Sequence, residues 1–145
     1  MTFTAGNPDQ VWQMGNGRLE IYVRQTPYAT ARLIIVTGRT RVATTAQRLL
    51  NNRWLDSGRF EADPTQTQRL PVTLCGQSLD NTREEGIYRV DALSLPAIRD
   101  RLTLPQGDRE QVVVVVAYGR NPPRLADELL KSLACRQLVP ELPPP

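Results

Sequence analysis

The sequence predicts an α+β fold: a mixed, mostly antiparallel sheet of about four to five strands, packed by about three helices. Two strand-like segments near the start can form a hairpin, five consecutive valines lie near the end, and three other segments repeat apolar residues at helical spacing. A length of 145 residues fits one domain with a buried core. We expect a loose lead-in over 1–17, a single domain over 18–139 and a proline-rich tail over 140–145.

Alternating polarity predicts the N-terminal hairpin. Within 18–25, Leu19 and Ile21 alternate with polar or aromatic residues, which is the pattern of a half-buried strand. A turn around Pro27 leads to the apolar segment 31–37. We expect the two segments to pair antiparallel at one edge of the sheet, where a partner protein could add a further strand.

The middle of the chain is predicted to alternate helices and strands. Helical spacing of apolar residues indicates two helices, and Pro96 lies in the first turn of the second one, where proline is tolerated. The predicted elements are a helix over 44–56, a polar loop over 59–69, strands over 70–74 and 86–91, and a helix over 93–102.

The strongest strand signal is the run of valines from 112 to 116. Five valines leave no polar face, so we expect the strand 112–118 to be central and buried on both sides. Its second face needs a cover, either from helices on both faces or from loops together with Trp12. Asn121 is then expected to cap a last helix that begins at Pro122 and turns a stripe of leucines to the sheet.

The sequence contains no histidine. This removes the commonest general base, the commonest metal ligand and every Ser–His or Cys–His nucleophile. The single lysine, Lys131, is expected to pair with Asp127 one helical turn before it. The acidic residues lack the spacing of a calcium loop. We therefore expect no catalytic residue, metal or cofactor, and keep an enzyme that relies on a cofactor or on carboxylates as a third possibility.

The two cysteines, Cys75 and Cys135, both lie off the apolar stripe of their predicted elements. A free cysteine is normally buried like a small hydrophobic residue, so we expect these two to form a disulfide between the third strand and the last helix. A disulfide would place the protein in an oxidising compartment. The alternative is two unrelated thiols, one in a second core and one beyond the helix end.

Basic residues are concentrated between 39 and 59, where five arginines accompany one acid. The segment starts where a strand ends and a helix is expected to begin, and a helix N-terminus favours an anion. The candidate contacts for an anion or a partner are Arg39, Arg41, Arg48 and Arg53. The alternative is a solvated helix face. The net charge of +3 is weaker than that of a typical nucleic-acid binder.

Tyr22, Arg24 and Tyr28 are candidate interface residues. Tyr22 and Arg24 are expected on the outward face of the first strand, and Tyr28 lies in the turn after it. Tyrosine and arginine are enriched at protein interfaces and among the residues that dominate binding energy there.

These observations predict a non-enzymatic protein-interaction domain, an accessory or assembly component of the bacterial cell envelope. It would be periplasmic or envelope-associated if a signal peptide has been removed, and cytoplasmic otherwise. The alternative is a cytoplasmic domain that binds nucleic acid or another polyanion through the arginine-rich segment 39–59. No apolar run approaches the roughly 18 residues of a membrane helix, so no membrane span is expected. The partner and the oligomeric state are left open.

Overall fold

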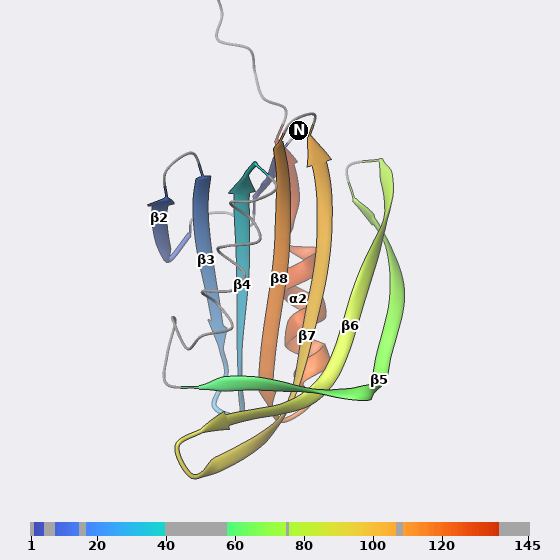
Figure 1. The fold of residues 1–145 in the computed structure, drawn as a ribbon. Helices are drawn as coiled ribbons and strands as arrows, with labels where there is room; N and C mark the ends of the chain where they lie inside the picture. Colours follow the sequence, from blue (N-terminus) through green and yellow to red (C-terminus); the bar gives the residue numbers. More distant parts are fainter. Residues whose placement is uncertain are drawn as a thin grey trace, which may run out of the picture.

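The computed structural model describes residues 2–4, 8–14, 17–39, 58–74, 76–106 and 109–136. Most of these residues form one antiparallel sheet of seven strands (Figure 1). In the described ranges one helix of ten residues accompanies the strands. The prediction of an α+β fold with about three helices is therefore wrong, because the protein is mostly β.

The order of the strands across the sheet differs from their order along the chain. From one edge to the other the strands are β2 (Gln10–Met14), β3 (Gly17–Gln25), β4 (Ala29–Gly38), β8 (Arg109–Gly119), β7 (Leu93–Gln106), β6 (Gln77–Val90) and β5 (Arg59–Leu74). The remaining described elements are α2 (Pro122–Lys131) and a separate pair, β1 (Thr2–Thr4) with β9 (Ala134–Arg136). All neighbouring strands are antiparallel, so the sheet is not mixed.

The predicted hairpin is confirmed, but its position at the edge is not. β3 and β4 pair antiparallel from Arg18 opposite Thr37 to Gln25 opposite Thr30. β2 pairs on the outer side of β3 and forms the edge instead, although it belongs to the expected loose lead-in. Its valine and tryptophan favour a strand, but a five-residue segment gives a weak pattern until a partner strand is present.

The predicted helix over 93–102 is strand β7. Ile98 and Leu102 are four residues apart, which suits one face of a helix and also one face of a strand, because four is an even number. Pro96 is compatible with this strand because residues 93–96 pair with β6 alone, so its missing N–H breaks no bond to β8.

The predicted loop over 59–69 belongs to β5, and the strand predicted over 70–74 is its second half. β5 and β6 form a long, bent hairpin at the edge opposite β2 (Figure 1). Most β5 side chains are exposed, which explains why a polar sequence forms a strand here. The predicted short strand 86–91 is the end of β6. The helix predicted over 44–56 and the tail 140–145 lie outside the described residues.

The central position and two-sided burial predicted for the valine strand are confirmed. β8 is the fourth of the seven strands, and its alternate valines enter two different clusters. Val113 and Val115 pack beneath α2 with Leu33 and Ile35, whereas the opposite cluster contains Leu19, Ile21, Ile34, Val36, Val112 and Val114. α2 lies behind β7 and β8 in Figure 1.

The predicted last helix is also confirmed, with a difference at its start. Leu125, Ala126, Leu129 and Leu130 are buried against the sheet as expected. Asn121 occupies the N-cap position, but its side chain makes no capping hydrogen bond. Its backbone is left-handed, with φ of 50°, a conformation that asparagine adopts more readily than most residues.

Candidate functional site

The three predicted interface residues do not share one environment. Tyr22 is buried in the cluster beneath α2, and its hydroxyl donates a hydrogen bond to Oε2 of Glu20 at 2.5 Å. The expectation that Tyr22 faces outward is therefore wrong, because the apolar cluster on the α2 side extends over this part of β3. Arg24 and Tyr28 are exposed, and 66% of the Tyr28 surface is accessible.

Tyr28 is held by the residues that follow β8. The backbone N–H of Arg120 donates to the carbonyl oxygen of Tyr28 at 2.9 Å. The Arg120 guanidinium lies over the Tyr28 ring, 4.9 Å from its centroid. Gly119 makes this approach possible, since a Cβ on it would lie 2.4 Å from the Tyr28 carbonyl oxygen and its φ is 112°. The main chains of Tyr28 and Arg120 are thus joined by a hydrogen bond, and their exposed side chains contact each other.

The first turns of α2 complete the same surface. Arg24 and Arg124 both lie close to the carboxylate of Glu128, with N–O distances of 3.7 and 3.8 Å. A hollow of about 360 Å³ opens between the turn and the helix, and Tyr28, Arg120 and Arg124 line it. We call Arg24, Tyr28, Arg120, Arg124 and Glu128 the tyrosine–arginine surface. Three arginines against one glutamate make it positively charged.

The N-terminus of α2, which lies at this surface, has few N–H groups that could bind an anion. Pro122 and Pro123 occupy the first two positions of α2 and carry no N–H. The N–H of Arg124 is donated to the carbonyl oxygen of Asn121 at 3.2 Å. Contacts to a negatively charged partner must therefore come from the arginine side chains.

The predicted anion-contact residues fall mostly outside the described part of the chain. Arg39 is described; it is exposed and follows the far end of β4, a ten-residue strand, from Tyr28. At roughly 3.3 Å per residue the strand separates the two residues by about 35 Å, so the structure does not bring them together. The residues outside the described ranges are Arg41, Arg48 and Arg53.

The proposed disulfide also stays a prediction. Cys75 lies outside the described residues. The backbone of Cys135 pairs with Phe3 between β9 and β1, but its side chain is not among those described.

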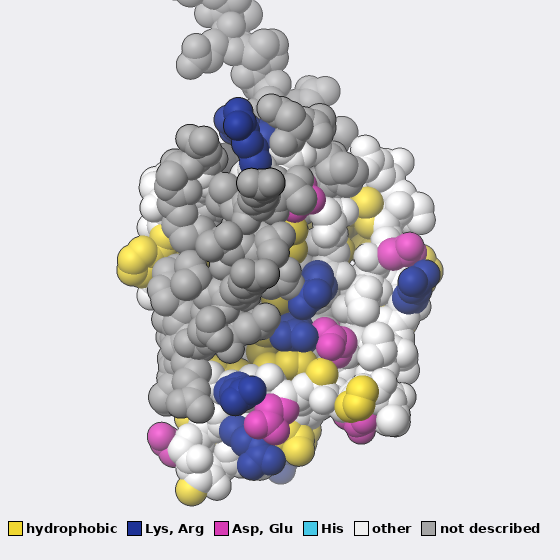
Figure 2. All heavy atoms as spheres, in the orientation of Figure 1, with side chains coloured by type: hydrophobic (Ala, Val, Ile, Leu, Met, Phe, Trp, Pro, Cys, Tyr) yellow, Lys and Arg dark blue, Asp and Glu magenta, His cyan; other side chains and the backbone are white. Residues whose placement is uncertain are grey.

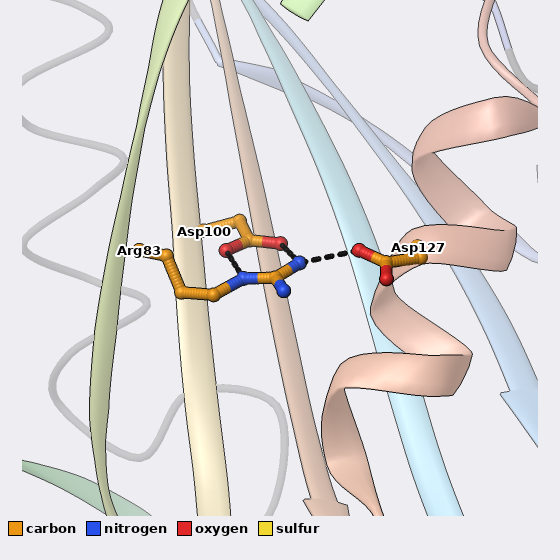
Figure 3. A network of polar contacts seen from close by, with 3 residues as sticks. All are labelled: Arg83, Asp100 and Asp127. Atoms are coloured by element: carbon orange, nitrogen blue, oxygen red, sulfur yellow. Dashed lines mark hydrogen bonds and ion pairs between the residues drawn. The ribbon is translucent and has the colours of Figure 1, made fainter. Parts of the chain in front are cut away.

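A second polar cluster lies inside the fold (Figure 3). Arg83 donates from Nε and Nη2 to the two carboxylate oxygens of Asp100 at 2.7 and 2.9 Å, and Nη2 also donates to Asp127 at 2.6 Å. The bonds to Asp100 raise the pKa of Arg83 above its ordinary value. Sequence spacing predicted an ion pair between Asp127 and Lys131, but Asp127 accepts a hydrogen bond from Arg83. We interpret this cluster as a clamp between β6, β7 and α2.

Arginines and aromatic rings also meet on the face opposite α2. The rings of Tyr88 and Tyr118 stack with centroids 4.1 Å apart. Arg99 lies over the ring of Phe60 at 4.9 Å and donates to Glu84 at 2.9 Å. Basic and acidic side chains lie next to one another on this face in Figure 2. Their charges are therefore partly balanced within the fold, whereas on the tyrosine–arginine surface one glutamate accompanies three arginines.

Two further classes of site are absent from the described residues. No group of three Asp, Glu or Cys side chains there could hold a metal ion. No helix in the same ranges is long and apolar enough to cross a membrane.

The chain matches no model of a known protein family and no curated protein.

Proposed function

We propose that the chain is a non-enzymatic protein-interaction domain that binds an acidic segment of a partner protein through the tyrosine–arginine surface. The observation that carries this proposal is the exposed pair Tyr28–Arg120, held in position by a backbone hydrogen bond and a ring contact. A fixed aromatic ring loses little conformational entropy on binding, and arginine makes bidentate contacts with carboxylates.

The charges around the pair support an acidic partner. Glu128 is shared by Arg24 and Arg124 at distances longer than a good hydrogen bond. A partner carboxylate can therefore bind either arginine without first breaking a strong ion pair. The hollow beside Tyr28 offers room for one apolar side chain of the same segment. A role in the bacterial cell envelope remains part of the proposal and depends on the disulfide between Cys75 and Cys135.

The first experiment measures binding of defined peptides by fluorescence anisotropy. The probes are ten-residue peptides with one leucine and several glutamates, and matched peptides with glutamine in place of glutamate. We expect the acidic peptides to bind more tightly, with an affinity that falls as salt rises. Tyr28→Ala and Arg120→Ala should each weaken binding about tenfold, which corresponds to about 1.4 kcal/mol.

Arg18→Ala is the matched control, because Arg18 is an exposed arginine of the same hairpin at the other end of β3. Equal binding of acidic and glutamine peptides would contradict the proposal, as would equal losses in the Arg120 and Arg18 variants. A heparin fragment tests the alternative function. Tight heparin binding that Arg39→Ala weakens and Arg120→Ala leaves unchanged would favour the polyanion-binding domain instead.

A further inference from the structure

The two edges of the sheet differ in how they are protected against pairing with another strand. β5 carries Pro64 and Pro71, an irregular register between Ala62 and Thr67, and several charged side chains. Prolines, bulges and charges are the usual devices that keep an edge strand from pairing. β2 has the sequence Gln-Val-Trp-Gln-Met, with no charge and no proline. In the described ranges no strand pairs with its outer side.

Apolar side chains lie on both faces of this edge strand. Trp12 is 48% exposed and is opposite Leu19, so it lies on the face of the cluster that contains Leu19 and Ile21. Val11 is 44% exposed and lies on the other face, because successive residues of a strand alternate. Figure 2 shows hydrophobic side chains at the molecular surface over β2. A strand added here would cover apolar surface as well as bind the backbone.

We propose that β2 pairs antiparallel with β2 of a second copy of this chain, which joins two seven-stranded sheets into one. A neutral strand can face its own copy without placing like charges opposite each other. A two-fold axis at the middle residue, Trp12, is the arrangement that pairs all five residues. It places Trp12 against the partner's Trp12 and continues the apolar cluster around Leu19 across the interface.

The expected strength follows from the length of the strand. Five residues provide few backbone hydrogen bonds and a small contact area, and small interfaces are transient. We expect a dimerisation constant between about 10 µM and 1 mM. This association does not use Tyr28 or the arginines around it, so it is independent of the proposed partner binding.

Sedimentation equilibrium over about 10 µM to 1 mM tests the proposal at the concentrations where such a dimer forms. We expect the average mass to rise from that of one chain toward that of two. Trp12→Glu places two like charges at the axis and should keep the protein monomeric. Trp12→Lys alone should do the same. An equimolar mixture of these two variants should associate again, because opposite charges then meet at the axis.

Leu93→Glu is the control, because Leu93 is an exposed apolar residue, 62% accessible, at the β6–β7 turn. It should associate as the unmodified chain does. Circular dichroism checks that each variant is folded, and Val11→Lys replaces any Trp12 variant that is not. A chain that stays monomeric at the highest concentration would overturn the proposal and would leave the edge to a strand of another protein. Association that survives Trp12→Glu would also overturn it.

Discussion

Arg83 is the residue at which three elements of the fold meet. It lies on β6, its paired bonds reach Asp100 on β7, and its third bond reaches Asp127 on α2. Arg83 is 8% exposed and Asp100 1% exposed, so removing Asp100 takes away the buried partner of Arg83 and leaves it the bond to the half-exposed Asp127. Sequence spacing could not predict this contact, because Arg83 and Asp127 are 44 residues apart, whereas the expected Lys131 is one helical turn away.

Replacing the two aspartates should therefore have unequal effects. We expect Asp100→Ala to lower the free energy of unfolding by about 3 kcal/mol, because the buried guanidinium loses both bonds to its buried carboxylate and keeps only the bond to Asp127. Asp127→Ala should cost about 1 kcal/mol or less, since the side chain of Asp127 is 52% exposed and water can replace it. Urea denaturation measures both values. Equal losses would show that burial does not determine the contribution of this clamp.

The contribution of the same clamp to the free energy of unfolding should not change with pH near neutrality. Its bonds raise the pKa of Arg83 in the folded state above the ordinary value. A group with a raised pKa stabilises the fold fully below its unfolded value and loses that contribution only as the pH rises through the folded value. Both values lie far above neutrality, so we expect this contribution of Arg83 to stay constant between about pH 6 and 9. Loss of the stabilisation by Arg83 within that pH range would contradict the ion pair.

At the scale of elements, the strands and helices that could be predicted are those whose own residues identify the buried face. The hairpin strands, the valine strand and the last helix each carry enough apolar residues to mark the buried face. β5 and β7 do not. β5 is a polar edge strand held by β6, and β7 buries Asp100 between Ile98 and Leu102 because Arg83 neutralises it. Their conformation depends on partners that are distant in the sequence.

Gly86 of β6 shows how closely β6 approaches the backbone of β5. A Cβ at this position would lie 2.0 Å from the carbonyl oxygen of Glu61 and 2.9 Å from Cα of Ala62, both backbone atoms of β5. We expect Gly86→Ala to push the first part of β5 away and to increase amide hydrogen exchange over residues 59–62. Exchange measured by mass spectrometry reports this locally.

Gly76→Ala provides the comparison. Gly76 has φ of 70°, so alanine there has a strained backbone. No atom lies within 4 Å of the position that its Cβ would take, so there is no steric clash. The substitution should lower overall stability by about 1–2 kcal/mol without a selective effect on residues 59–62. A similar exchange pattern in both variants would contradict the close approach at Gly86.

At the scale of the whole molecule, the candidate surface combines what the sequence shows with what it does not. Arg24 and Tyr28 could be predicted, because both belong to one short segment with a recognisable composition. Arg120 and Arg124 could not, because only the pairing of β4 with β8 brings Gly119 opposite Ala29 and places these arginines beside the turn. The pairing that creates the surface also links the two apolar clusters.

β4 and β8 supply alternate residues to the clusters on both faces of the sheet, so neither cluster can open while the other stays intact. We therefore expect one cooperative unfolding transition, with the same midpoint by tryptophan fluorescence and by far-ultraviolet circular dichroism. Leu129→Ala on the α2 side and Ile34→Ala on the opposite side should each cost about 2–5 kcal/mol and shift both signals equally. Lys131→Ala, at an exposed position, should change the midpoint little. A variant that shifts one signal and not the other would show that the two faces unfold separately.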